Sequence, residues 1–341
     1  GVPTTRSLAV VKTGETVQRE KTLQGAVLTR VASSHIRVGT FQYASLLKNK
    51  NDLKTLFDYT VKRHYPYLRD LKNPVIELLK VVMDKHISLV INWMRIGFVH
   101  GVMNTDNVTI SGETIDYGPC AFMDRYDPKT VFSSIDYNGR YSYFNQPGIT
   151  RWNLSRFAES LILLIDDKKD KAVEIASEVI NSFAEKYKKE WLNMMRKKLG
   201  LIGEELEDEN LIVKLLTWMH KNQMDYTNTF YFLTKKDNSK SKIYNNQNFT
   251  NWKNQWEKRL KLNKNSPEKS FKLMSLSNPA VIPRNHNVED ALNSASEDND
   301  LTKVHDLLKI LQKPYDYNLQ FGSYQSVPNL DSEKYKTFCG T

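Results

Sequence analysis

The sequence feature that most constrains the fold is a short stretch with two strand-like runs. Residues 98–124 read FVHGVMNTDNVTISGETIDYGPCAFMD. The β-prone runs 108–110 and 114–115 flank a Ser-Gly-Glu sequence that is typical of a tight turn. The stretch therefore predicts a short β-hairpin between two loops.

Oxygen-bearing side chains stand at both open ends of this hairpin. Asp106 and Asn107 precede the first strand, and Asp116 follows the second. Because an antiparallel hairpin brings its outer ends together, we expect the three side chains to converge. Hard divalent cations prefer carboxylate and amide oxygens, with substrate phosphates and water completing the shell. The hairpin therefore predicts that Asn107 and Asp116 bind Mg²⁺ or Mn²⁺ together with a nucleotide, as an Asn and an Asp do in protein kinases.

One position departs from the kinase pattern. Kinases of the aminoglycoside and choline type carry His-Gly-Asp, four further residues and then Asn. Here His100 and Gly101 are followed by Val102, and Asn107 lies at the expected spacing. Valine cannot accept a proton, so ordinary transfer of a γ-phosphate is not expected. Asp106 is the nearest replacement and is the candidate catalytic base.

Several long segments together resemble one family. The segments GVPTTRSLAVV, GAVLTRVASSHIRVGTFQY, QPGITRWNLSRFAE, NPAVIPRNHNVEDAL and TFCGT, with the hairpin, are similar to the selenoprotein O family. The resemblance covers most of the chain and is weakest in the middle third. It implies an α+β, protein-kinase-like fold that is a pseudokinase by motif. It also implies that ATP binds in a flipped orientation and that AMP passes to Ser, Thr or Tyr hydroxyls of proteins.

Two arginines are candidates for binding the phosphates. Arg30 and Arg37 lie in the segment that precedes the first expected helices. A guanidinium group suits phosphate because its planar fork donates two hydrogen bonds and stays charged. From the residues alone, an ordinary surface role is an equal alternative. The resemblance implies that both arginines contact phosphate.

The resemblance also sets the expected domain organisation. Residues 1–45 are the remainder of a small β-containing lobe with the hinge, and residues 46–312 form a large, mainly helical lobe. The large lobe contains the hairpin of residues 98–124 and an activation-like segment at 116–148. An extended tail follows at 313–341.

Two local patterns predict secondary structure within these parts. The N-terminal stretch 6–18 has the pattern of a hairpin, with strand-like runs at 7–11 and 16–17 and a turn at Lys12-Thr13-Gly14-Glu15. Asn73 is a good helix cap, Pro74 suits a first helical turn, and apolar residues recur at helical spacing to about Arg95. We expect one long helix there, with its apolar stripe in the core.

The upstream parts of a kinase-like lobe are not recognisable. A glycine-rich loop, a strand lysine and a helix glutamate normally precede the region with which this chain begins. The chain starts at Gly1 directly in family sequence, so we expect it to lack the N-terminal part of the family. A catalytically inactive pseudokinase that serves as a binding module is therefore the alternative function.

Composition narrows the partners. The net charge is +10, but the lysines are spread through Lys/Asn-rich segments without a nucleic-acid-binding module, so we expect no nucleic acid. No apolar run approaches the length of a membrane-spanning helix, so we expect no membrane partner. Two cysteines do not make a disulfide scaffold, so we expect a cytoplasmic location in a bacterium, or a mitochondrial one in a eukaryote. We expect a monomer that binds ATP and protein substrates.

Three further features each allow two interpretations: the cysteine pair, the acids of the activation-like segment and a polar cluster near the C-terminus. The resemblance implies a redox link from the tail, for which Cys339 and Cys120 are the only pair, although a packed thiol also fits Cys120. Acids of the activation-like segment (Asp124, Asp127 and Asp136) are either further metal ligands or solvated loop residues. The cluster Pro-Arg-Asn-His at 283–286 is either a site or a set of structural hydrogen bonds.

Overall fold

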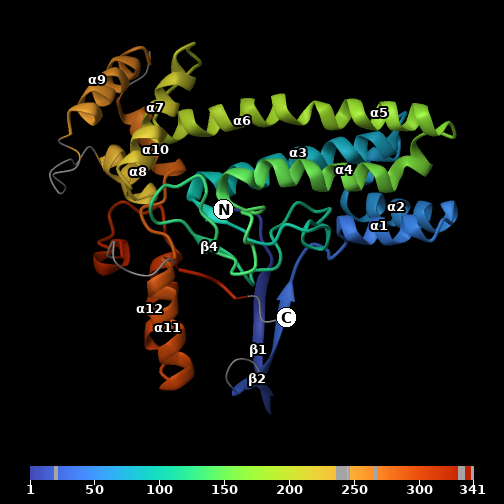
Figure 1. The fold of residues 1–341 in the computed structure, drawn as a ribbon, viewed down its shortest axis with the longest axis horizontal. Coiled ribbons are helices and arrows are strands. Elements are labelled where there is room, and N and C mark those ends of the chain that lie inside the picture. The colour runs from blue at the N-terminus through green and yellow to red at the C-terminus, as the bar shows by residue number, and fades with distance from the viewer. Residues whose placement is uncertain (19–21, 236–243, 245, 264–266, 329–334, 339–341) are drawn as a thin grey trace.

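The computed structural model of the chain describes residues 1–18, 22–235, 244, 246–263, 267–328 and 335–338. Its fold is α+β and protein-kinase-like, as expected, with a β-hairpin first and a largely helical body after it (Figure 1). Two antiparallel pairs of strands are present in the described residues: β1 (Arg6–Gln18) with β2 (Thr22–Val31), and β3 (Phe98–Val99) with β4 (Ala121–Phe122).

The helices follow the N-terminal hairpin and make up most of the rest. They are α1 (Val38–Leu46), α2 (Lys50–His64), α3 (Pro74–Ile96), α4 (Gln146–Ile165), α5 (Lys169–Asn181), α6 (Phe183–Lys198), α7 (Asp208–Lys221), α8 (Tyr226–Lys235), α9 (Gln247–Lys261), α10 (Pro267–Ser277), α11 (Asn285–Glu297) and α12 (Thr302–Leu311). In the described part of the chain, none of them is long and apolar enough to cross a membrane.

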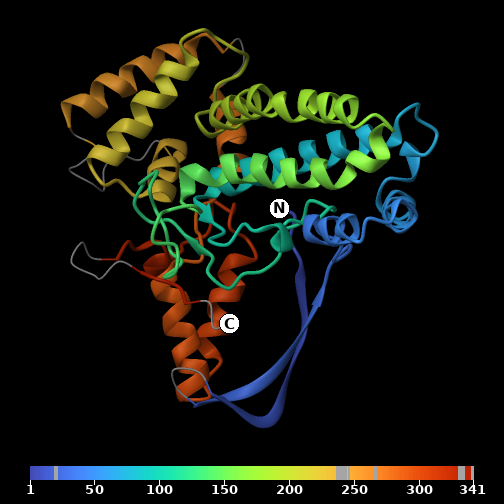
Figure 2. The same ribbon diagram turned by 45° about the vertical axis from the view of Figure 1, so that its right-hand side comes forward.

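The β1–β2 pair forms an arm that extends away from the helical body (Figure 2). The predicted turn at residues 12–15 is wrong, because β1 continues through it to Gln18. Lys12 pairs with Ala26 and Thr16 with Gln24, so three residues of β1 face Gly25 alone. Such a bulge needs unusual backbone angles, and Gly14 supplies them with a φ of 78°. The glycine that suggests a turn therefore marks a bulge.

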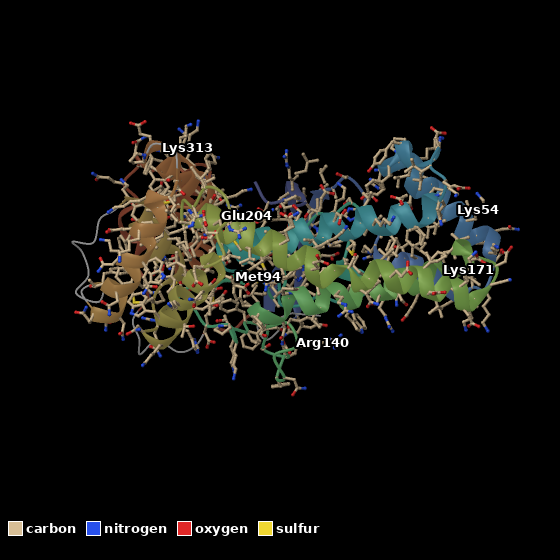
Figure 3. The ribbon with its side chains drawn as sticks, turned by 90° about the horizontal axis from the view of Figure 1, so that it is seen from above. Lys54, Met94, Arg140, Lys171, Glu204 and Lys313 are labelled. Atoms are coloured by element: carbon tan, nitrogen blue, oxygen red, sulfur yellow. The ribbon has the colours of Figure 1, made fainter. Side chains whose placement is uncertain are left out.

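The long helix α3 agrees with its prediction. The Asn73 side chain accepts the N–H of Ile76, Pro74 lies in the first turn, and Gly97 ends the helix with a φ of 73°. The apolar stripe of α3 is buried, and α4 and α6 pack against it (Figure 3). Phe41 of α1 meets Phe157 of α4 edge-on at 5.1 Å between ring centroids. This core delivers the chain from Gly97 into the hairpin at a fixed place.

The activation-like segment has little regular secondary structure, and the beginning of the tail packs on another part of the chain. Residues 116–148 contain only β4, the short 3₁₀ helix η3 (Tyr143–Asn145) and the start of α4, in agreement with the loop-rich expectation. In the tail, Tyr317 and Phe321 pack with Ala280 and Val281 in a small second cluster. Buried aromatic area accounts for this packing. The domain boundaries themselves stay a prediction.

Candidate functional site

The predicted hairpin is present but has little strand. A single bridge joins Val108 to Thr114, and the Gly112 N–H donates to the Thr109 carbonyl at 3.3 Å across the turn. The outer edges of the hairpin pair with distant segments. Thr109 bridges to Arg37 at the start of α1, and the Thr114 N–H donates to the Pro3 carbonyl at 3.0 Å. The hairpin is therefore clamped between the N-terminal segment and α1.

Asn107 and Asp116 meet at the open end of the hairpin, as predicted. Nδ2 of Asn107 donates to Oδ2 of Asp116 at 2.8 Å and to the Val102 carbonyl at 3.0 Å. Oδ1 of Asp116 accepts the Gly118 N–H at 3.1 Å. Because both hydrogens of the Asn107 amide are engaged, its Oδ1 remains as an acceptor. The amide nitrogen of Asn107 thus faces the Asp116 carboxylate, and the amide oxygen remains as a further donor atom for a ligand.

This pair has the donor chemistry of a magnesium or manganese site. Both groups are hard oxygen donors, and Mg²⁺ is commonly held by one or two protein oxygens with substrate phosphates and water. No group of three or more His, Cys, Asp or Glu residues in the described ranges could hold a metal by itself. A cation at Asn107 and Asp116 would therefore need oxygens from a bound nucleotide.

Asp106 takes a different position from its neighbour. It is exposed in the 3₁₀ helix η2 (Thr105–Asn107), and its carboxylate lies against Gly39 in the first turn of α1. Its backbone N–H is held by Oδ1 of Asn104 at 3.0 Å. The structure therefore brings Asp106 to the start of α1, beside the hairpin.

The two candidate arginines lie in different surroundings. Arg37 is the N-cap residue of α1, and its Nε is buried without a hydrogen-bond partner among the described residues. Arg30 lies on the exposed arm, on β2 opposite Ser7. Within the described residues neither arginine forms an ion pair with a carboxylate. Arg37 is thus a cation next to the hairpin that no carboxylate of the described residues neutralises by an ion pair.

Four buried side chains hold the hairpin from behind, three through its backbone carbonyls and one through a hydroxyl, and sequence reasoning missed this role for all of them. Nε2 of His86 lies 2.7 Å from the Thr109 carbonyl, and Nε2 of His100 lies 2.8 Å from the Ile115 carbonyl. The Tyr65 hydroxyl donates to the Ile110 carbonyl at 2.6 Å, and Trp93 Nε1 donates to the Thr114 hydroxyl at 3.0 Å. The signal in the sequence was a histidine and a tryptophan on the apolar stripe of α3, since buried polar groups need partners.

Burial also fixes the charge of the two histidines. It lowers the pKa of His86 to about 4, and it lowers the pKa of His100, because the charged imidazolium is disfavoured away from water. Both rings are therefore neutral at pH 7 and can each donate one N–H to a hairpin carbonyl.

The remaining acids and the 283–286 cluster have structural partners. Arg284 is 1% exposed and pairs with Asp124 and, at 2.8 Å, with Asp225. Asn285 exchanges hydrogen bonds with the backbone of Phe122. Asp127 accepts the N–H of Lys129. Asp136 accepts the N–H groups of Arg140 and Tyr141. The hydrogen-bonding interpretation of the 283–286 cluster agrees with these contacts.

Cys120 lies beside the tail. Burial raises the pKa of its thiol to about 11. The Thr337 hydroxyl donates to the Pro119 carbonyl at 2.8 Å, and Thr337 also bridges to Ser133. The predicted partner, Cys339, lies outside the described residues.

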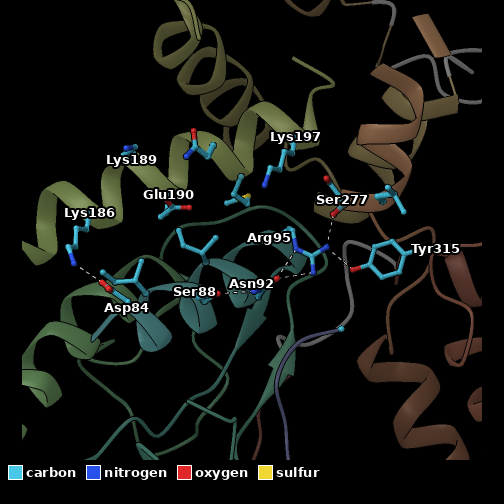
Figure 4. Close-up of a pocket in the computed structure, with 16 residues that line it drawn as sticks. Asp84, Ser88, Asn92, Arg95, Lys186, Lys189, Glu190, Lys197, Ser277 and Tyr315 are labelled. Carbon is cyan, nitrogen blue, oxygen red and sulfur yellow. Dashed lines mark hydrogen bonds and ion pairs between the residues drawn. The ribbon is translucent and has the colours of Figure 1, made fainter. Parts of the chain in front are cut away.

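A separate cavity of about 800 Å³ lies between α3 and α6 (Figure 4). Arg95 projects into it and donates to the Ser277 carbonyl at 2.9 Å and to the Tyr315 hydroxyl at 2.8 Å. Lys186 pairs across it with Asp84 at 2.7 Å. Among the predicted site residues that the structure describes, none lines this cavity. The site at the hairpin is therefore distinct from it.

Comparison with known proteins bears on the whole chain. The family model described as "Protein adenylyltransferase SelO" matches residues 1–312. The chain belongs to the SelO family. A SelO relative from Pelagibacter ubique, named "Protein nucleotidyltransferase YdiU", is 56% identical over 340 residues. Relatives of the same name from Alcanivorax borkumensis and Nitrosococcus oceani are 53% and 51% identical.

The extent of these matches confirms the resemblance seen in the sequence. Each match spans all of this chain and 69–70% of the relative. The hairpin and both candidate arginines lie within the matched region.

Proposed function

We propose that this chain transfers AMP from ATP to Ser, Thr or Tyr hydroxyls of proteins. The SelO family to which it belongs consists of protein nucleotidyltransferases. The observation that carries the proposal is the contact between Asn107 and Asp116 at 2.8 Å, in a kinase-like hairpin whose usual catalytic aspartate position holds Val102. Such a site can bind a metal-nucleotide complex but lacks the ordinary kinase base.

The binding roles follow from the donor chemistry of the residues. Asn107 and Asp116 would hold Mg²⁺ or Mn²⁺, which when bound neutralises charge on the phosphates. Arg37 would contact phosphates of ATP in a flipped orientation, and Arg30 would assist from the arm. The buried Nε of Arg37 has no partner in the described structure, and this supports an anionic ligand next to it.

The proposed reaction is a displacement at the α-phosphorus. Asp106 accepts the proton of the substrate hydroxyl, and the hydroxyl oxygen forms a bond to the α-phosphorus. The bond from that phosphorus to the oxygen bridging to the β-phosphate breaks. Pyrophosphate leaves with the electron pair, and AMP remains on the protein. Positioning and charge neutralisation supply most of the catalysis in such transfers.

Labelled ATP tests the proposal directly. The chain is incubated with a protein acceptor, Mn²⁺ or Mg²⁺, and ATP labelled at either the α- or the γ-phosphorus. We expect α-label on protein, no γ-label, and loss of the α-label by at least about 100-fold for Asp116→Ala. Asp70→Asn, an exposed acid before α3, is the control and should keep the label.

Each other outcome has a definite meaning. γ-Label on protein would mean phosphorylation in place of AMP transfer. Absence of both labels, with ATP or a partner still bound, would favour the inactive binding module. Full-length YdiU from Pelagibacter ubique, 56% identical over the shared region, serves as a second enzyme in the same assay.

We also propose that Cys120 and Cys339 form a disulfide when an external oxidant, such as a peroxide, takes up the two electrons and two protons of the thiols. The tail residue Thr337 lies against Pro119, so the chain approaches Cys120 shortly before Cys339. Peptide mapping of oxidised protein without reductant should find the cross-linked pair, and two free thiols would remove the proposal.

A cytoplasmic location and a monomeric state stay predictions; the three relatives named above come from bacteria.

A further inference from the structure

Gly39 stands in the first turn of α1, where its backbone does not require glycine. It follows Val38 at the start of the helix, and its φ is not among the positive values of the described glycines. Alanine is a better helix former at such a position, because glycine loses more backbone entropy. The reason for a glycine must therefore lie in the space around it.

That space is taken by Asp106. A Cβ added to Gly39 would overlap Oδ1 of Asp106 and would lie 3.1 Å from its Cγ. The next contact is the Thr105 carbonyl oxygen at 3.5 Å, an ordinary van der Waals distance. The missing side chain of Gly39 thus makes room for the Asp106 carboxylate specifically.

We infer that Gly39 is a positioning residue for Asp106, whose carboxylate seats against the first turn of α1. The inference rests on the proposed function, in which Asp106 accepts the proton of the attacking hydroxyl. This position of the carboxylate is electrostatically favourable, since the N–H groups at a helix N-terminus carry partial positive charge. The first turn of α1 has no acidic side chain of its own.

Neither backbone is free to move away from an added methyl group. The Val38 N–H donates to the Val108 carbonyl at 2.9 Å, which ties α1 to the hairpin directly after η2. The Asn104 side chain holds the Asp106 N–H, and the Asn107 side chain holds the Val102 carbonyl. A methyl group at Gly39 would therefore be accommodated by rotation of the Asp106 side chain. The carboxylate would move away from the first turn of α1, while Asn107 and Asp116 stayed in place.

A matched glycine provides the control. Gly148 lies in the first turn of α4, and a Cβ added there meets no atom of the described structure within 4 Å. Gly39→Ala and Gly148→Ala are thus the same chemical change in the same helical context. They differ in whether the methyl group reaches Asp106.

The experiment compares Gly39→Ala, Gly148→Ala, Asp106→Asn and the double variant Gly39→Ala/Asp106→Asn. Initial rates of α-label incorporation are measured against ATP concentration, and thermal unfolding is recorded for each. We expect Gly39→Ala to lower kcat by at least about 10-fold, with KM for ATP and Tm close to wild type. Gly148→Ala should match wild type. The double variant should be no slower than Asp106→Asn, because both changes remove the same group.

Two results would overturn the inference. One is an unchanged kcat for Gly39→Ala. The other is a double variant in which Gly39→Ala lowers the rate of Asp106→Asn by the same factor as in wild type. If Asp106→Asn keeps full activity, the assignment of the base fails.

A crystal structure of Gly39→Ala judges the position independently of activity. A rotated Asp106 side chain over an unchanged Asn107–Asp116 pair supports the inference. An Asp106 side chain in its present place refutes it, whether or not any label is transferred.

Discussion

The buried imidazole of His86 makes the stability of the hairpin dependent on pH. Its Nε2 lies 2.7 Å from the Thr109 carbonyl, and burial lowers its pKa from 6.5 to about 4. Charging the ring costs burial energy and replaces a neutral donor by a cation in an apolar core. We therefore expect acid to destabilise the protein through this residue.

The sign and size follow from proton linkage. Because the folded pKa lies below the unfolded one, the unfolded chain binds more protons between about pH 4 and 6.5. The contribution of His86 to the free energy of unfolding is therefore fully present above pH 6.5 and is lost as the pH falls through this window. A single site with these two pKa values loses about 2 kcal/mol between pH 7 and pH 5.

Urea denaturation of wild type and His86→Gln at pH 7 and pH 5 measures this loss. Glutamine keeps an N–H donor for the Thr109 carbonyl but does not titrate. The stability advantage of wild type over the variant should shrink by about 2 kcal/mol between the two pH values. His100 is buried in both proteins, so its contribution cancels. An advantage that stays constant with pH would refute the reasoning.

Two further predictions concern the segment after the hairpin. Arg284→Met leaves the carboxylates of Asp124 and Asp225 without their cation, so it should lower the free energy of unfolding by about 3–5 kcal/mol. Urea denaturation measures this loss, and the exposed ion pair between Lys303 and Asp290 serves as the reference: Lys303→Met should leave the free energy of unfolding nearly unchanged. Burial raises the pKa of Cys120 to about 11, so less of the reactive thiolate is present at neutral pH. Alkylation of Cys120 at pH 7.5 should therefore be about 100-fold slower in the folded protein than in the protein unfolded by urea. Equal rates in the two states would contradict this account.

The sequence determined those parts of the molecule that depend on neighbouring residues. Asn73, Pro74 and Gly97 begin and end α3, because caps and left-handed ends act within one turn of the chain. Asn107 and Asp116 meet because one short turn separates them. The donor chemistry of the candidate metal site could therefore be proposed before the fold was known.

Tertiary structure decided the parts that depend on packing between distant segments. Gly14 reads as a turn, and only its partner strand β2 makes it a bulge. Arg284 reads as a polar loop residue, yet its partner Asp124 lies 160 positions away. Asp106 belongs to the hairpin in sequence, but Gly39 of α1 provides the space for its carboxylate. Local patterns contain no record of which remote side chain will fill a given space, because that choice is made when the core packs.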